Sequence, residues 1–301
     1  MVMPTAPVAL YHYTNSAGLK GILESSSLWA TGAEFLNDAQ ELQFGRNELC
    51  DALRAYAEDL FPSNRTPDGG KEYSRATIVR SALQYLDRGD VNVPVKTERI
   101  YVTCFCQDSD LLSQWRGYAS ADGYAIGFRS AALLDQVPLA TEYRVVGQYG
   151  FEAERRAGPE VRPSLVQVQY GDLAVTRMIE NVVQKIAPQP MGHPRSQGWM
   201  QAVSLAVPAL ASIKHGAFAE EKEWRLHVGG MGPGLKESFR VGSYGIIPYV
   251  ELPLDLHNAI HEVVVGPGKY SDVRMTGVAR LLRSRDLDSV NVRASSAPFR
   301  G

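Results

Sequence analysis

Segments with the alternating pattern of a β-strand are spread over the whole chain, and this spread constrains the fold more than any other feature. In Arg99–Cys106 every second residue shares a face, with Ile100 and Val102 opposed to Tyr101 and Phe105, as in a half-buried strand. Further strands are expected over Val8–Tyr13, Ser27–Thr31, Gly123–Phe128, Glu142–Gln148, Ser164–Tyr170, Glu223–Val228, Ser238–Ile247, Val250–Pro253, His261–Val265 and Ser289–Arg293.

Helical patterns separate these strands. Leu19, Ile22 and Leu23 have helical spacing and follow Asn15 and Ser16, either of which can cap a helix. Further helices are expected from Asp38 to about Leu60, over Ser74–Leu86, from Asp108 or Ser109 through Tyr118, and over Leu173–Ile186, Trp199–Ile213 and Ser271–Leu282. No proline-rich turn is long enough for a domain linker. The sequence therefore predicts an α+β fold, a single domain over 1–301, with helical insertions at about 38–90 and 172–216.

Composition excludes some classes of protein. The formal net charge is −2, which gives no strong signature of nucleic-acid binding. The three cysteines cannot all pair, and Cys104 and Cys106 share one face of a strand, so a reduced compartment is expected. The first residues lack a signal-peptide pattern, and no apolar run is long enough to span a bilayer. The expected location is the cytoplasm, without membrane contact.

The first candidate site segment is Leu10–Thr14. Side chains alternate on a strand, so His12 and Thr14 share a face at its end, where both can hydrogen-bond a small molecule. Tyr13 lies between them and is a further candidate contact. The alternative is a structural histidine whose ring is satisfied by the backbone, and for a lone histidine this is the commoner case.

The second candidate segment runs from Leu112 to Tyr118. Trp115 and Tyr118 can sandwich a planar ring, and Arg116 can pair with a phosphate or carboxylate. Ser113 and Gln114 add polar groups to the same stretch. The alternative is a helix whose apolar side chains simply pack into the core.

The third candidate segment contains two nearby carboxylates. If it is a strand, Glu221, Glu223 and Arg225 line one face. Carboxylates this close repel each other, so one is expected to have a raised pKa or to pair with an arginine. The alternative is a solvated, charged edge strand, which composition alone favours.

Two other segments do not match the functional motifs that they suggest, a phosphate loop and a zinc site. Val263–Lys269 resembles a phosphate loop, but a valine stands at the first glycine and Tyr270 follows the lysine. His215 and His227 flank the acidic pair without a zinc-like spacing, so no metal is expected.

Together these motifs resemble a bacterial family known only as a domain of unknown function, over nearly the whole chain. The residues that carry the resemblance are Leu10–Thr14, Phe35–Asp38, Cys104–Phe105, Leu112–Tyr118, Phe218–Arg225, Ile247–Tyr249 and Val265–Pro267.

A more distant resemblance is to the ADP-ribosyltransferase fold, a split mixed and largely antiparallel sheet. It rests on the His-x-Thr strand, the Gly-Leu-x-x-Ile-Leu helix after it, and a late strand bearing glutamate. The resemblance implies that NAD is bound as a substrate and that a late glutamate holds the nicotinamide ribose. The implied roles are NAD binding by His12 and Thr14, stacking on nicotinamide by Tyr101, Ser113 or Trp115, ribose binding by Glu223 or Glu221, and pyrophosphate binding by Arg116 or Arg225.

Three hypotheses follow. The first is an NAD-consuming, mono-ADP-ribosyltransferase-like protein, of the kind found among toxins and defence effectors, that modifies an unknown macromolecule or hydrolyses NAD. The second is a non-catalytic module that binds a nucleotide or a protein. The third is a metal-dependent hydrolase or nuclease that uses the acidic pair.

Overall fold

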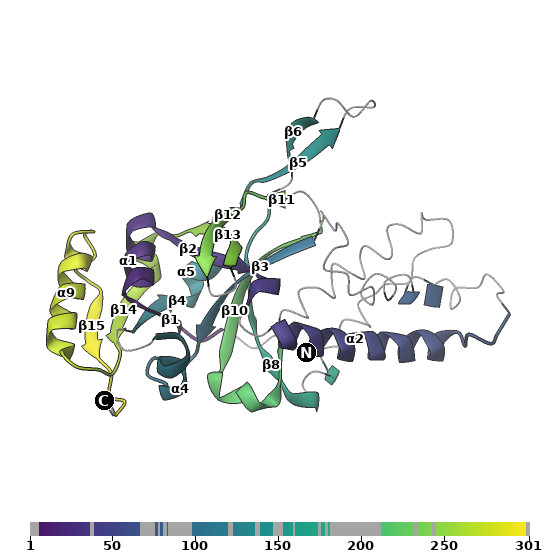
Figure 1. Ribbon diagram of the computed structural model, residues 1–301, viewed down its shortest axis with the longest axis horizontal. Coiled ribbons are helices and arrows are strands. Elements are labelled where there is room, and N and C mark those ends of the chain that lie inside the picture. Colours follow the sequence, from purple (N-terminus) through teal and green to yellow (C-terminus); the bar gives the residue numbers. More distant parts are fainter. Residues whose placement is uncertain are drawn as a thin grey trace.

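The computed structural model has an α+β architecture in which helices pack against a large mixed sheet (Figure 1). No helix in the described part of the chain is long and apolar enough to cross a bilayer. The structure describes residues 6–36, 39–66, 76–77, 79–80, 83, 98–119, 123–135, 139–146, 153–158, 160–173, 176–177, 180, 212–231, 234–242 and 245–298.

The main sheet contains ten strands, and all its pairs are antiparallel except that of β14 with β15. Two of the ten, β10 (Glu223–Met231) and β7 (Ser164–Gln167), pair with each other, and β10 also pairs with β3. The other eight follow the order β12 (Ser238–Gly242), β13 (Gly245–Pro253), β2 (Ser27–Gly32), β3 (Glu98–Cys106), β1 (Ala9–Thr14), β4 (Tyr124–Arg129), β14 (Ile260–Val265) and β15 (Asn291–Ala294).

The sheet is split along one edge of β3. Strand β10 pairs with β3 along its whole length, from Cys106 to Glu98, and so occupies one edge. Strands β1 and β2 must therefore share the other edge, where β1 pairs at Cys106 and β2 at Val102 and Tyr101. Among the described strands none pairs with residues 103–105 on that edge. The sheet opens between β1 and β2, and this opening positions the candidate site.

The two faces of the sheet have separate cores. On one face Leu10, Phe105 and Leu226 pack with residues of α1 (Ser16–Ser25) and α9 (Ser271–Arg283). On the other face Tyr13, Cys106, Ala125 and Val264 pack with Trp115. Alternation along the strands therefore puts Leu226 in the first core and leaves Glu223, Arg225 and His227 facing the opposite way.

The predicted α+β class with a mixed sheet is confirmed. Of the predicted insertions, the first begins with α2 (Ala39–Leu60), which extends away from the sheet (Figure 1). The helices predicted over Ser74–Leu86, Leu173–Ile186 and Trp199–Ile213 lie largely outside the described residues. Smaller sheets accompany the main one, β11 (Gly234–Leu235) with β5 (Thr141–Val146) and β6 (Ala153–Ala157), and β8 (Gln169–Tyr170) with β9 (Ile213–Lys214).

Three element predictions are wrong in their extent. The strand predicted over Ser164–Tyr170 is two strands, β7 and β8, which belong to different sheets. The strand predicted over Ser238–Ile247 is a hairpin, because Gly242 pairs with Gly245, whose φ of 99° favours glycine. The helix predicted to begin at Asp108 or Ser109 is only α4 (Leu112–Gln114), continued by the π-helix η2 (Trp115–Ala119).

Neither predicted cap residue caps this helix. Lys222 pairs with the Asp108 carboxylate at 2.9 Å, and Arg293 donates to Ser109 Oγ at 2.8 Å.

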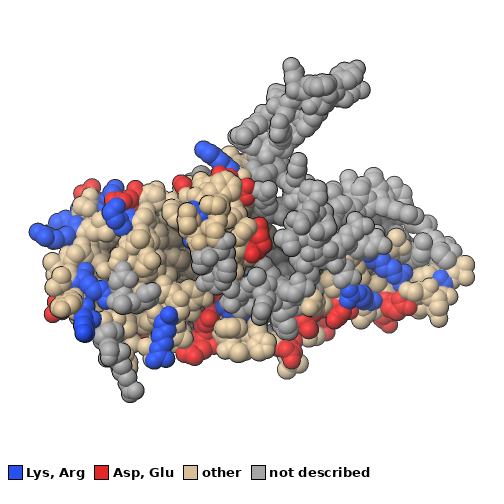
Figure 2. Space-filling view, in the orientation of Figure 1, with Lys and Arg blue, Asp and Glu red and all other residues tan. Residues whose placement is uncertain are grey.

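On the face seen in Figure 2, basic and acidic side chains of the described residues are interspersed. The described residues of that face therefore show no large patch of a single sign.

Candidate functional site

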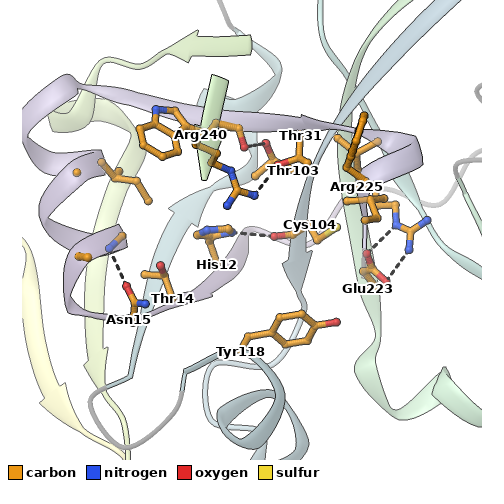
Figure 3. Close-up of a pocket in the computed structure, with 18 of the residues that line it drawn as sticks. His12, Thr14, Asn15, Thr31, Thr103, Cys104, Tyr118, Glu223, Arg225 and Arg240 are labelled. Atoms are coloured by element: carbon orange, nitrogen blue, oxygen red, sulfur yellow. Dashed lines mark hydrogen bonds and ion pairs between the residues drawn. The ribbon is translucent and has the colours of Figure 1, made fainter. Parts of the chain in front are cut away.

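The split between β1 and β2 contains a cavity of about 590 Å³. This volume lies within the range of roughly 300–1,000 Å³ that is typical of small-molecule sites. Helix α1 and strand β2 line one side, β10 and η2 line the other, and residues 102–104 of β3 lie between them. In Figure 3, Asn15 and Glu223 lie at opposite ends with His12 between them.

The lining divides into two regions of different chemistry. The charged end consists of Tyr118, Lys214, Glu223 and Arg225. The uncharged end, from α1, β2 and the short helix η1 (Ala33–Phe35), consists of Ala17, Gly18, Gly21, Ile22, Trp29 and Phe35.

His12 closes the base of the split. Its Nδ1 lies 2.9 Å from the carbonyl oxygen of Cys104, which belongs to the part of β3 that lacks a strand partner on that edge. Because a carbonyl only accepts, Nδ1 carries the proton and donates. Burial lowers the pKa of His12 below 6.5, which the bond to Cys104 opposes only in part. The ring is therefore neutral at pH 7, and its Nε2 has the character of an acceptor.

Local interactions fix the turn from β1 to α1. Asn15 caps the helix, accepting from the backbone nitrogen of Gly18 at 2.9 Å. A Cβ on Gly18 would lie only 1.9 Å from Thr14 Oγ1, so this position requires glycine while the Thr14 hydroxyl packs there. As predicted, Thr14 and His12 line the same cavity.

Glu223 is the centre of a buried ion network. Arg225 holds both carboxylate oxygens, with Nε 2.6 Å from Oε1 and Nη2 3.2 Å from Oε2. Lys214 Nζ lies 3.3 Å from Oε2, and the Cys104 thiol also donates to the carboxylate. Burial raises the pKa of Glu223, but the charges and hydrogen bonds of Arg225 and the charge of Lys214 outweigh burial and hold the pKa below 4.5. Glu223 is therefore an ionised carboxylate in a mostly buried site.

Glu221 lies just before the strand, which begins at Glu223 as predicted, so Glu221 and Glu223 do not share a strand face. Glu221 ends the 3₁₀-helix η4 (Gly216–Glu221), and Lys222 adopts a left-handed conformation (φ 44°) before β10 begins at Glu223. Glu221 nevertheless stays close, because Lys214 Nζ lies 2.7 Å from its Oε2. One buried lysine thus bridges both glutamates.

The π-helix separates the two aromatic residues predicted to sandwich a ring. Tyr118 lines the cavity and is 39% exposed. Trp115 is in the core, where it packs edge-on against Tyr13 at 4.7 Å and donates from Nε1 to Asp110 at 2.7 Å. The predicted stacking role of Trp115 is therefore not supported by its position. Burial, followed by the charge of Glu221, raises the pKa of the Tyr118 phenol, which stays protonated.

Several other predicted residues lie outside the cavity. Tyr101 is in the core and donates to Glu237 at 2.7 Å, and Tyr13 donates to the carbonyl of Asp108 at 2.8 Å. Ser113 donates to exposed Glu220 at 3.2 Å, and Arg116 is exposed and does not line the cavity.

A second hollow of about 60 Å³ adjoins the charged end. Gln114, Tyr13 and Glu221 line it, and it shares His12, Cys104, Tyr118 and Glu223 with the large cavity. Its volume is enough for one or two water molecules, each of which occupies about 30 Å³ in the liquid.

Sequence reasoning missed two cations of the cavity. Lys214 is 1% exposed and comes from β9, just after a segment predicted to be helical. Arg240 comes from β12, and its Nη2 donates to Thr31 Oγ1 at 3.2 Å. Alternation along β12 would bury apolar Phe239 and Val241 and expose Arg240, but Phe239 and Val241 are exposed, so the sequence pattern carries no signal for the position of Arg240.

Arg240 is the one lining cation that is not paired with a carboxylate of the described residues, since Lys214 and Arg225 both pair with Glu223. Its buried Nε has no hydrogen-bond partner among them. Within the described residues no group of His, Cys, Asp and Glu side chains is arranged to hold a metal ion.

The model of a family described as a protein of unknown function, DUF2971, matches residues 114–226, so the predicted resemblance to such a family is confirmed for this stretch. No curated protein sequence matches the chain. The solved structure of Thermus sp. 2.9 DarT in complex with NAD+ is similar over 97% of both chains, at 13% identity and a TM-score of 0.29. A TM-score this low carries no argument about function.

Proposed function

We propose that the split cavity binds NAD and that the protein is an ADP-ribosyltransferase-like enzyme that cleaves the bond between nicotinamide and ribose. The observation that supports this most is the pairing, in one cavity of suitable size, of a neutral histidine acceptor with a buried, ionised glutamate. His12 and Glu223 belong to strands that flank β3, and both line the opening of the sheet.

The proposed reaction places positive charge on the ribose. The C–N bond breaks, its electron pair stays on the nicotinamide nitrogen, and C1′ of the ribose becomes oxocarbenium-like, as in glycoside cleavage. An acceptor hydroxyl, amine or water then attacks C1′ and loses its proton. A fixed carboxylate that binds a ribose hydroxyl strengthens its hold as the positive charge develops. Glu223 has the ionisation and burial for this role.

Tyr118 is the aromatic residue suited to the nicotinamide ring. It is the aromatic side chain of the charged end, and it lines both the large cavity and the adjoining hollow. A ring that stacks on Tyr118 would place the bond to be broken near Glu223. The small hollow, which also reaches Glu221 and Gln114, would then admit the acceptor.

Arg240 replaces the predicted candidates for pyrophosphate binding. Arg116 does not line the cavity, and Arg225 is already neutralised by Glu223. The guanidinium of Arg240 points into the cavity toward His12 (Figure 3) and has donors to spare. A charge-assisted contact with phosphate fits this geometry.

The test is incubation with NAD while nicotinamide release is followed, with mass spectrometry to separate free ADP-ribose from a modified protein or nucleic acid. Glu223→Gln should lower the rate by roughly 100-fold or more, the loss typical of removing one transition-state contact. Glu220→Gln is the matched control, because Glu220 is exposed and lines neither hollow. Release at background by both the wild type and Glu223→Gln would refute the proposal.

One observation favours a second candidate, a module that binds the nucleotide without turning it over. A carboxylate offers about four acceptor positions, and Glu223 already receives two donors from Arg225, one from Lys214 and one from Cys104. Turnover requires a ribose hydroxyl to replace one of them. The contact to Lys214 at 3.3 Å is longer than either contact to Arg225, and Lys214 keeps its 2.7 Å partner Glu221 when the contact is lost. Saturable binding of NAD without product would establish this second candidate.

A further inference from the structure

The uncharged end of the cavity is lined by small and aromatic residues that suit a flat ring. Three of its residues, Ala17, Gly18 and Gly21, are small residues on one side of α1. A Cβ built on Gly21 meets nothing within 4 Å, so the helix surface there is open space. Glycine within a helix costs stability, about 1 kcal/mol relative to alanine. The surface is thus kept free of side chains at a cost.

Trp29 supplies an aromatic face at the same end. Although it is a large apolar residue, it is 44% exposed, and it lines the cavity. Its ring is already held against Tyr249, with centroids 4.5 Å apart and an angle of 31° between the planes. Its backbone is fixed as well, because Thr103 donates to the Trp29 carbonyl at 3.1 Å. Because the Trp29 side chain is already ordered, stacking of a ligand ring on it costs little side-chain entropy.

The neighbouring residues determine what can be attached to that ring. Thr31, two residues after Trp29 on β2, shares its face and accepts from Arg240. A phosphate bound by Arg240 would thus lie next to a ring bound at Trp29. Glu251, the strand partner of Trp29 on β13, is exposed on the same face without lining the cavity, and its negative charge disfavours a further phosphate beside Trp29.

We infer that the slot formed by Trp29 and the glycine-bearing side of α1 binds the adenine ring of the dinucleotide and selects NAD over its 2′-phosphorylated form. This inference rests on the proposed function and fixes the direction of the ligand, with adenine at the uncharged end and nicotinamide at the charged end. It also names the specificity: a planar aromatic base on a ribose without a 2′-phosphate.

Calorimetric titration with ADP-ribose tests the slot without turnover. Trp29→Ala should weaken ADP-ribose binding about 5- to 150-fold, the range that stacking of one base supplies, and Trp29→Phe should retain most of the affinity. Nicotinamide mononucleotide, which lacks adenine, should bind wild type and Trp29→Ala equally. The matched control is Phe239→Ala, because Phe239 is 62% exposed and does not line the cavity.

A second pair of variants tests the other wall. Gly21→Leu should weaken ADP-ribose binding while the protein stays folded, since the new side chain enters open space. Gly277→Leu is its control, a glycine of α9 whose Cβ also meets nothing within 4 Å and which lies outside the cavity. The wild type should also bind NAD at least tenfold more tightly than the 2′-phosphorylated dinucleotide.

The outcomes separate this inference from the proposed function. Equal affinity of wild type and Trp29→Ala for ADP-ribose, or no binding by the wild type, overturns the slot. If the rate of nicotinamide release is the same in Trp29→Ala as in the wild type, adenine binding by the slot is refuted and the proposed NAD cleavage is retained. If ADP-ribose binds through Trp29 but the wild type releases no nicotinamide from NAD, adenine binding by the slot is supported and the proposed enzymatic activity is refuted.

Discussion

The charged and the uncharged ends of the cavity are built in opposite ways. At the charged end, Lys214, Glu223 and Arg225 are each at most 5% exposed and hold one another in ion pairs. At the uncharged end, Gly21 leaves open space and Trp29 is half exposed. A buried charge must be paired, so the charged end cannot relax without losing stability, whereas an apolar slot has no such requirement. The site therefore has one rigid end and one end that tolerates change.

The largest expected effect comes from breaking the rigid end at Arg225. Arg225→Met should lower the free energy of unfolding by about 3–5 kcal/mol, because Glu223 would keep a buried charge without its bidentate partner. Urea unfolding measures this. Arg283→Met is the control, since its pair with Asp288 is exposed and should contribute little. The double variant Arg225→Met/Glu223→Gln should regain part of the loss. A loss no greater than in the control would show that the network is not rigid.

Lys214 should have the next largest effect. Lys214→Met should cost about 1.5–3 kcal/mol, the value of a hydrogen bond to a charged group. Removing its positive charge should also raise the pKa of Glu223, so the acid limb of nicotinamide release should move to higher pH. Lys214→Arg keeps the positive charge, so the acid limb of its pH profile should return to the wild-type position. A purely structural defect would not be rescued in this way.

Lys20→Met breaks an exposed pair with Glu24 and is the control for Lys214→Met. An unmoved acid limb in an active Lys214→Met would contradict the role given to Lys214.

The sequence predicts the local parts of the site well. His12 and Thr14 line one cavity because alternation on a strand is a local property, and the Asn15 cap follows from residue type alone. The pairing of Glu223 with an arginine was also expected from the two carboxylates, although Glu221 turned out to lie before the strand.

The rest depends on long-range contacts or on unusual backbone geometry. Residues 115 and 118 would share one face of an α-helix, but the π-helix changes the spacing, so Tyr118 lines the cavity and Trp115 is buried. Lys214 reaches Glu223 only because β9 lies next to the start of β10, where Tyr170 accepts from the Glu223 backbone nitrogen at 2.7 Å. No pattern within the sequence encodes these pairings.

His12, held by one hydrogen bond between the two ends, should show a smaller and pH-dependent effect. Its folded pKa is lowered, so below pH 6.5 the unfolded chain takes up a proton that the folded state does not. Its contribution to stability is therefore complete above pH 6.5 and falls with acidification, by at most about 1.4 kcal/mol per pH unit. The folded pKa of Glu223 is also lowered, so its contribution to stability should be lost in a separate pH window, below pH 4.5.

Urea unfolding from pH 7.5 to 5 tests this separation. The stability difference between wild type and His12→Gln should narrow as the pH falls, while that between wild type and Glu223→Gln should stay constant until about pH 4.5. His227 and His261, whose pKa values are also lowered by burial, are present in both proteins and cancel. A difference for His12→Gln that does not change with pH would mean that the ring is not held neutral.

The smallest effect on the free energy of unfolding is expected at the uncharged end, and it should be stabilising. Gly21→Ala should raise the free energy of unfolding by about 0.5–1 kcal/mol, because alanine favours the helix and its Cβ meets nothing within 4 Å. Gly277→Ala, an exposed glycine of α9, should gain a similar amount, which makes it the matched control in thermal unfolding. Only Gly21→Ala should weaken ADP-ribose binding. If Gly21→Ala destabilised the protein, the slot would not be open space, and the contrast between a rigid and a tolerant end would fail.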